Sequence, residues 1–565
     1  MISYKIFFYN LFLLVFLLGC ETSFPKDNID PTSFSSIIDS DNDFIPDSIE
    51  SYIGLDIDNS DINNNGILDG LDNEGIYGDK FFDEQWYIYS QSKITNSSGV
   101  SSIRGNDLGL LNIYKKYMGL NRGDNIIIQV VDEGIYARHE DLTDNIDRKR
   151  SYDGLESDAI PMPRSDQEHG TKVAGVIAAR AFNGKGIRGI IPFAKIASSN
   201  WLLYGNYNIL DRVWYSGYGS NKIAVSNNSW GFEFSTDTIF EEYMKKGSNE
   251  LRDGKGRLYV FPSGNKRTDN GNANLEYLLN NRFAIVVSSI NYNNKISSYS
   301  SQGSNILTCA YSGENKDKTP TIATTTIPHT SSNRGDNQTT WYDDNSRSYT
   351  YDFDGTSAAA PMVSASLGLV LEACPSLGWR DIRYLIATTS KKIDKNNLSW
   401  IRNSAGLSHS NNYGFGLINP TKMIEICQDN YQNLPKLKTT EVNKNIFIPI
   451  SDDNLANKFN INIIQDIKIE WVELTIDIDH QYASDIRIDL ISPSGTRSNL
   501  IDINDISGNS YKNSTTANWM NGGFRFSTAS MIEESSRGIW RVEVYDTTSG
   551  DVGNIKSAKL NIYGH

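Results

Sequence analysis

Cysteine, histidine and basic side chains are all scarce in this chain of 565 residues. Only six histidines are present, and the four cysteines are Cys20 and the odd set of Cys309, Cys374 and Cys427. Disulfide bonds are therefore not expected to be the main source of stability. Acidic residues number 68 against 53 lysines and arginines, which gives a net charge of −15. This balance argues against nucleic acid as a partner and suits basic substrates and cations.

Apolar runs long enough to cross a membrane are also lacking. The most apolar stretch, residues 6–19, is too short for a convincing span, and it predicts an export signal peptide over residues 1–19. The stretch ends in Leu17-Leu18-Gly19-Cys20, which resembles a bacterial lipoprotein signal in which Cys20 becomes the lipidated first residue. The alternative is an ordinary signal peptide with an incidental cysteine. We expect an exported protein, anchored in the membrane of a bacterial cell envelope through lipid on Cys20.

Residues 20–78 form an acidic segment whose oxygen-bearing side chains recur with the spacing of a calcium loop, at positions 1, 3, 5, 9 and 12. Two such loops are present: Asp39, Asp41, Asp43, Asp47 and Glu50, then Asp61, Asn63, Asn65, Asp69 and Asp72. Gly66 holds the sixth position of the second loop, where glycine is expected, whereas the first loop has Phe44 there. The segment resembles the Asp-rich calcium repeats of secreted bacterial proteins, and a disordered acidic spacer is the alternative. We expect a tether that calcium stiffens.

Three later segments carry the residue types of nucleophilic catalysis. Asp132 follows the apolar run 126–131, His169 precedes Gly170, and Ser357 lies within the small-residue run 355–361. A serine hydroxyl becomes a nucleophile when an imidazole accepts its proton and a carboxylate orients that imidazole. An aspartate after a buried strand suits the carboxyl edge of a parallel sheet, where α/β sites are built. The chain order Asp, His, Ser is the order found in subtilisin.

A fourth segment, residues 258–265, predicts a buried strand that ends in a turn at Asn265. An isolated asparagine there is usually a turn former. Because this one lies between the histidine and serine segments, we expect its amide to donate to the oxyanion that develops during acyl transfer.

Together these segments resemble a subtilisin-like serine protease of the kexin/furin branch, whose members are calcium-dependent endopeptidases. The branch is indicated by 81–86, similar to the start of the mature catalytic domain, by Ser229-Trp230-Gly231, and by 379–385 and 413–416 near its end. The resemblance covers residues 79–430 and implies an α/β fold, with a parallel sheet flanked by helices. It places the catalytic roles on Asp132, His169 and Ser357, and the oxyanion donor on Asn265.

The resemblance also implies a buried calcium site and a substrate cleft. The calcium ligands fall on Asp79, Asp141 and Asn183, and backbone carbonyls near Lys185 would supply others. The cleft residues fall on Ser229, Trp230, Gly231, Ser263 and Gly264. Members of the branch have a second calcium site with acidic ligands. In this sequence Gly271 and Ser301 stand at those acidic positions.

The branch cleaves after basic residues because acidic side chains line its substrate cleft. This sequence has acidic residues at only some of those positions. Glu276 falls where an aspartate closes the primary pocket, with a solvated helix residue as the alternative. Glu233 keeps a second charge, but Phe234 replaces the acidic residue that follows it. A preference for lysine or arginine before the cleaved bond is therefore an expectation that rests mainly on Glu276.

Residues 440–565 show short alternating strands separated by turn residues, the pattern of a β-sandwich. Segments 538–546 and 560–564 resemble the P domain, the jelly-roll partner of kexin-like proteases, which supports folding of the catalytic domain.

Two functions remain from different classes. The first is an active serine endopeptidase that acts on protein or peptide substrates at a bacterial envelope. The second is a surface binding protein on an inactive protease scaffold, which a missing catalytic residue would reveal, and none is missing. Relatives usually carry an inhibitory propeptide, and little more than the acidic segment lies between Cys20 and Asp79. Either the fold forms without one, or another protein assists it.

Overall fold

A computed structural model of the chain describes residues 38–75, 77–95, 100–121, 124–154, 161–164, 167–203, 209–232, 236–314, 319–328, 348–453, 455–502 and 519–565. All of them belong to one compact unit, Ile37–His565. The predicted signal peptide with Cys20 lies outside the described residues, and so does Glu233.

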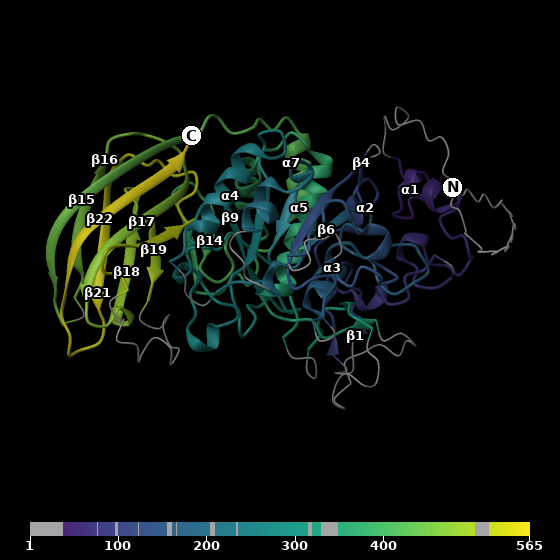
Figure 1. Cartoon of the computed structure of the whole chain (residues 1–565), viewed down its shortest axis with the longest axis horizontal. Coiled ribbons are helices and arrows are strands. Elements are labelled where there is room, and N and C mark those ends of the chain that lie inside the picture. The colour runs from purple at the N-terminus through teal and green to yellow at the C-terminus, as the bar shows by residue number, and fades with distance from the viewer. Residues whose placement is uncertain are drawn as a thin grey trace, which may run out of the picture. The chain divides into compact units, whose positions relative to one another are not determined.

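A six-stranded sheet, parallel throughout, forms the centre of the larger domain (Figure 1), with the strand order β10-β9-β8-β7-β5-β6. Its strands are β5 (Ile127–Val131), β6 (Lys195–Ser199), β7 (Val225–Asn227), β8 (Leu258–Pro262), β9 (Ala284–Ile290) and β10 (Thr308–Tyr311). β5, β8 and β9 are buried at every residue. Their continuous apolar runs are typical of parallel strands that are covered on both faces.

Helices surround this sheet and bring the candidate residues to one edge. They are α2 (Leu111–Tyr114), α3 (His169–Ala178), α4 (Ile239–Glu250), α5 (Thr356–Ala373), α6 (Trp379–Thr389) and α7 (Pro420–Gln428). α5 packs across β5, β7, β8, β9 and β10 and against α3. Of the described helices, α5 is long and apolar enough to span a membrane by length and composition, but it is buried as the core helix of this domain.

Short two-stranded ribbons complete the larger domain. They are β1 (Ile94–Thr95) with β2 (Val100–Ser101), β3 (Leu120–Asn121) with β4 (Asp124–Asn125), β11 (Thr324–Thr325) with β12 (Tyr349–Thr350), and β13 (Trp400–Arg402) with β14 (Ser408–Ser410). A disulfide bond joins Cys374, after α5, to Cys427 in α7, and Cys309 is a buried free thiol.

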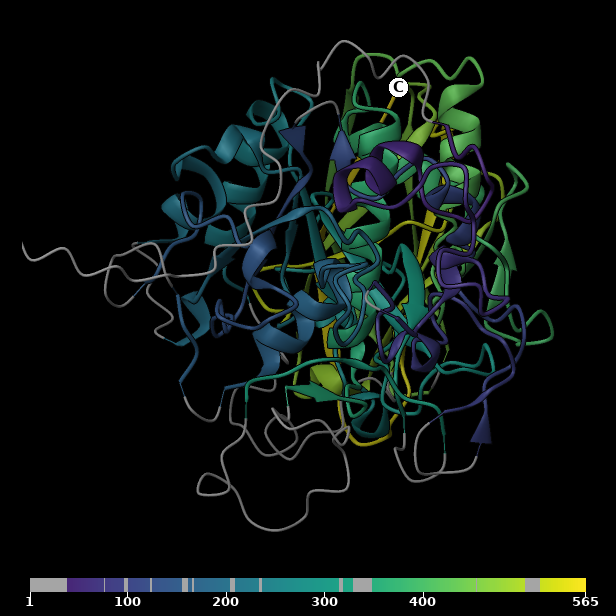
Figure 2. The same cartoon turned by 90° about the vertical axis from the view of Figure 1, so that its right-hand side faces the viewer.

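The described part of the acidic segment, from residue 38 to 78, is not a free tether. It contains α1 (Asp47–Ile53), whose Ile49 joins Ile45 in the same hydrophobic core as the central sheet. In Figure 2 this segment, in purple, lies in front of the teal and green ribbon, and Figure 1 shows it beside the blue ribbon at one end of the larger domain. The disordered spacer, which was the alternative, does not describe these residues, because the apolar side chains between the carboxylates are buried in that core.

The C-terminal domain is a sandwich of two antiparallel sheets, with the orders β15-β22-β17-β20 and β16-β21-β18-β19 (Figure 1). Its strands are β15 (Lys438–Ile450), β16 (Asn457–Ile463), β17 (Ile469–His480), β18 (Ile486–Ile491), β19 (Arg497–Ile501), β20 (Phe524–Thr528), β21 (Gly538–Asp546) and β22 (Gly553–Gly564). Alternation of buried and exposed residues along β16 and β22 gives each a core-facing side. The predicted β-sandwich is confirmed.

Candidate active site

The carboxylate of Asp132 lies beside the imidazole of His169. Asp132 directly follows β5, at the carboxyl end of the sheet, and His169 is the first residue of α3. The Nδ1 atom of His169 lies 3.0 Å from each carboxylate oxygen of Asp132. A side chain at Gly170 would place its Cβ 2.2 Å from the carbonyl oxygen of Gly134, so only glycine lets α3 approach this closely.

Two acidic residues, Asp132 and Glu133, position His169 and favour its protonated form. The backbone N–H of His169 donates to Oε1 of Glu133 at 2.8 Å. Burial alone would lower the pKa of His169, but the charge of Asp132 and the hydrogen bond to it outweigh burial and raise that pKa above its ordinary value. A carboxylate in this position stabilises the imidazolium that forms when the histidine takes a proton.

Ser357 is the second residue of α5, and its hydroxyl is anchored to the neighbouring chain. Its Oγ donates to the carbonyl of Ser229 at 3.1 Å, and Oγ of Ser229 donates back to the carbonyl of Ser357 at 3.0 Å. Within the described residues, Ser357 makes no hydrogen bond to His169. Its hydroxyl therefore has to turn from Ser229 toward the imidazole before it can pass on its proton.

Asn265 is positioned by the start of α5. Its Oδ1 accepts from the backbone N–H and from the hydroxyl of Thr356, both at 2.8 Å. This fixes the amide so that its Nδ2 lies beside Gly355, where a Cβ would be 3.0 Å away. Gly355 has φ +78°, a conformation that favours glycine. The Nδ2 of Asn265 and the backbone N–H of Ser357, at a helix N-terminus, form a pair of donors suited to an oxyanion.

The residues expected in the cleft run alongside this site. The indole N–H of Trp230 donates to the carbonyl of Val131 at 3.0 Å, which ties the cleft segment to the strand that carries Asp132. Oγ of Ser263 donates to the carbonyl of Ser301 at 3.0 Å, and Gly264 has φ +99° at the turn after β8.

Glu276 is buried beneath the cleft segment, so it is not a solvated helix residue. Its side chain is 3% exposed, and its Oε1 accepts from the backbone N–H of Phe232 at 2.7 Å. A Cβ placed on Gly231 would lie 3.2 Å from Oε2 of Glu276, so the carboxylate lies directly against this glycine. Burial raises the pKa of Glu276 to about 8.

The three residues expected to bind calcium in the larger domain do come together, but their oxygens are occupied. Both carboxylate oxygens of Asp141 accept hydrogen bonds, from Nδ2 of Asn183 and the backbone N–H of Ile187, each at 2.9 Å. Asp79 is paired with the buried guanidinium of Arg188, whose Nε donates to Oδ2 at 2.7 Å. No sequence pattern indicates this ion pair beyond the position of Arg188, just after the loop.

Arg188 already neutralises the carboxylate of Asp79, which makes that residue a weaker ligand for a divalent cation. The donor set of Asp79, Asp141 and Asn183 therefore does not fit a calcium ion as it stands. No catalytic step needs a cation here.

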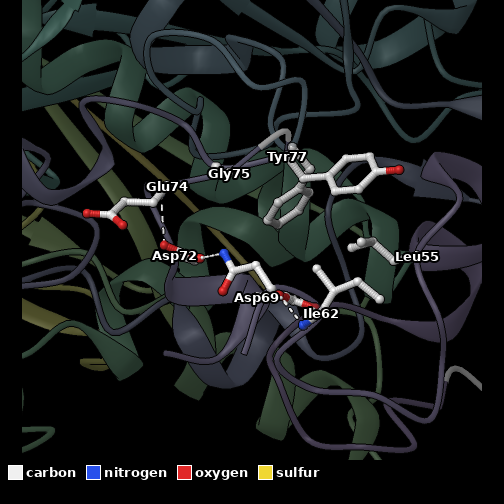
Figure 3. Close-up of a pocket in the computed structure, with 10 residues that line it drawn as sticks. Leu55, Ile62, Asp69, Asp72, Glu74, Gly75 and Tyr77 are labelled. Atoms are coloured by element: carbon white, nitrogen blue, oxygen red, sulfur yellow. Dashed lines mark hydrogen bonds between the residues drawn. The ribbon is translucent and has the colours of Figure 1, made fainter. Parts of the chain in front are cut away.

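The second Asp-rich loop is closed by its own hydrogen bonds. Oδ2 of Asp72 accepts from the side-chain amide of Asn63 at 2.7 Å, and both oxygens of Asp69 accept from the N–H of Ile62 (Figure 3). Oδ2 of Asp72 also accepts from the side-chain amide of Asn65 at 3.0 Å. The backbone N–H groups of Asn65 and Gly66 donate to Asp61. Beside the loop, Leu55, Ile62, Tyr77 and Phe182 help to line a cavity of about 270 Å³. Oxygens committed in this way are poor ligands for a cation.

Family models account for both domains. A model described as the Subtilase family matches residues 123–416, and a model described as the Proprotein convertase P-domain matches residues 469–562. The chain belongs to the subtilase family. The protease is 31% identical over 544 residues to the Aeromonas extracellular serine protease of Aeromonas sobria, covering 83% of this chain and 84% of that protein.

More distant relatives define the branch. The protease is 29% identical over 510 residues to Kexin of Saccharomyces cerevisiae, covering 86% of this chain but only 56% of the length of Kexin. The crystal structure of the Aeromonas sobria serine protease with its chaperone (ORF2) matches with a TM-score of 0.77 and 26% identity, covering 86% of this chain and 95% of that one. The protein is thus a subtilisin-like serine endopeptidase of the kexin type with a P domain, and the predicted fold class is confirmed.

Proposed function

We propose that this endopeptidase is calcium-dependent, works at a bacterial cell envelope and cleaves its protein substrates after basic residues. The observation that carries the substrate preference is the carboxylate of Glu276. It is buried against Gly231 and has no cationic partner among the described residues. A lysine or arginine side chain that enters from the cleft would supply the missing positive charge, and a buried charge pair discriminates strongly between substrates.

The reaction follows from the positions of four side chains. Oγ of Ser357 attacks the substrate carbonyl as His169 takes its proton, and Asp132 stabilises the imidazolium. Nδ2 of Asn265 and the backbone N–H of Ser357 donate hydrogen bonds to the carbonyl oxygen and stabilise its developing negative charge. His169 then returns the proton to the leaving amine, and a water molecule, activated in the same way, hydrolyses the acyl-enzyme.

Location and assembly are also proposals. Lipid on Cys20 would anchor the protease, and the disulfide bond between Cys374 and Cys427 supports export to an oxidising compartment. The Aeromonas sobria relative has been solved with a chaperone, which supports the idea that a partner assists folding here as well.

The proposal is tested with the purified full-length protein, a fluorophosphonate probe and an unbiased peptide library. The probe is expected to label the protein and to leave a Ser357→Ala variant unlabelled. The library is expected to be cut after arginine and lysine, and more slowly once calcium is chelated. A labelled protein that cuts mainly after uncharged residues would contradict the substrate preference and leave the family chemistry intact.

A further inference from the structure

The first Asp-rich loop, residues 39–50, differs from the second in the state of its oxygens. Oδ2 of each of Asp39, Asp41 and Asp43 is buried and makes no hydrogen bond among the described residues. One ligand oxygen from each of these three aspartates lies within 4.8 Å of the others. Carboxylate oxygens that are buried, close together and without hydrogen-bond donors are costly to hold unless a cation lies among them.

Glu50 adds an independent observation. It lies in the first turn of α1, its side chain is 0% exposed, and neither carboxylate oxygen makes a hydrogen bond within the described part of the chain. A carboxylate buried in this way without a hydrogen-bond donor is costly unless a cation lies beside it. Glu50 holds position 12 of the loop, where calcium loops place a glutamate that binds the ion through both oxygens.

The backbone of the loop has the turn of a calcium loop despite its unusual residue. Phe44, at position 6, has φ +80°, close to the φ of +84° at Gly66 in the second loop. A bulky residue rarely adopts this conformation, so the turn at Phe44 is held by its surroundings. The backbone N–H of Asp43 donates to Oδ1 of Asp39 at 3.1 Å and of Asp41 at 3.2 Å, which points these side chains inward.

We propose that a calcium ion binds in the loop 39–50, through the carboxylates of Asp39, Asp41, Asp43 and Glu50, and fastens residues 38–78 onto the catalytic domain. Hard oxygen donors in this number suit calcium. Asp47 is committed elsewhere, because its two oxygens accept from the N–H and hydroxyl of Ser40. The only basic group that reaches these four carboxylates within the described residues is Lys115, with Nζ 3.8 Å from Oδ2 of Asp39.

A continuous set of contacts links this loop to the start of the catalytic domain. Gly70 lies against the carbonyl of Asp43, where a Cβ would be only 2.3 Å from that oxygen. The carbonyl of Gly70 accepts from Nη1 of Arg188 at 2.7 Å, and the same guanidinium holds Asp79. Arg188 thus neutralises Asp79, where the family resemblance places a calcium ligand. Through Gly70, Arg188 also connects Asp79 to the first Asp-rich loop, whose carboxylate oxygens lack hydrogen-bond donors.

This inference deepens the calcium dependence proposed above and rests on it, so its test measures binding rather than activity. Full-length protein with the Ser357→Ala change, which prevents self-cleavage, is freed of metal and titrated with calcium by calorimetry. Glu50→Gln and Asp43→Asn are each expected to weaken the tightest site by about 100-fold or more. Asp72→Asn, in the second loop, and Asp141→Asn, at the family position, are the matched controls and are expected to keep it.

Thermal unfolding of the same proteins gives a second readout. Calcium is expected to raise the melting temperature of the parent and of Asp72→Asn, but not that of Glu50→Gln. The proposal is overturned if Glu50→Gln and Asp43→Asn bind calcium as the parent does, if Asp141→Asn alone loses the ion, or if the parent binds none. Failure of fluorophosphonate labelling in the protein with Ser357 would contradict the proposed function without affecting these results.

Discussion

The side-chain amide of Asn274 in the catalytic domain pairs with the backbone of Ser527 in the P domain. Its Oδ1 accepts from the N–H of Ser527 at 3.0 Å, and its Nδ2 donates to the carbonyl of Ser527 at 3.1 Å. Nδ2 also donates to the carbonyl of Leu500 at 3.2 Å. Asn274 stands two residues before Glu276, so the P domain contacts the segment that carries the carboxylate we propose to set specificity.

Replacing Asn274 with alanine is expected to damage specificity as well as stability. The buried N–H of Ser527 loses its acceptor, which costs about 1–3 kcal/mol, whereas the carbonyl of Ser527 keeps the hydroxyl of Ser304 at 2.7 Å. Because Glu276 is then less well fixed, KM for arginine substrates is expected to rise more than KM for leucine substrates. Steady-state kinetics on paired peptides check this.

The control is Arg380→Met, which breaks a different contact between the two domains, the pair of Arg380 with Glu470. It is expected to lower stability without changing the ratio of arginine to leucine cleavage. An equal change of this ratio in both variants would show that Asn274 has no particular role in the pocket.

Asn265 is expected to act through its donor nitrogen. Asn265→Ala should lower kcat by about two to three orders of magnitude with little change in KM. Asn265→Asp keeps the oxygen that accepts from Thr356 but loses the donor. If the aspartate variant retained most of the activity, the role of Asn265 would be to hold the start of α5 instead.

The pH dependence of KM reports on Glu276. Its pKa is raised to about 8, so the empty pocket is mostly uncharged below that pH and charged above it. KM for arginine substrates is expected to fall as pH rises toward 8, by up to about tenfold per pH unit, and then to level off. In Glu276→Gln this dependence and the preference for arginine over leucine should both disappear; kinetics that match the parent would place the pocket carboxylate elsewhere.

The pH dependence of fluorophosphonate labelling reports on His169 separately, because the probe carries no basic side chain. The imidazole must be neutral to accept a proton, and its pKa is raised by Asp132. The labelling rate is therefore expected to fall with decreasing pH, with a midpoint above the ordinary value of about 6.5. Asp132→Asn should slow labelling by about 10⁴-fold and move the midpoint down. A midpoint unchanged by Asp132→Asn would mean that another group controls His169.

The sequence predicted the fold class, which is confirmed, and it supplied the candidate site residues, because both leave local signals. The runs before Asp132 and Asn265 are continuous and apolar, as parallel strands must be, and the C-terminal strands alternate. It did not predict the pairing of Asp79 with Arg188, because residues more than 100 positions apart meet only through the folded chain. For the same reason Phe44 counted against the first loop, although it adopts the turn that glycine would otherwise provide, with its ring centroid 4.8 Å from Nζ of Lys115 in the catalytic domain.

Ser357, the proposed nucleophile, is the second residue of α5, the buried core helix of the catalytic domain. Ser357 is held by α5, whose 18 residues cross five strands of the central sheet. No local opening of a surface loop can displace such a residue, since moving it requires the core itself to separate. Residual proteolytic activity after heating should therefore track the fraction of molecules with an intact core, and each unfolded molecule becomes a substrate for those that survive.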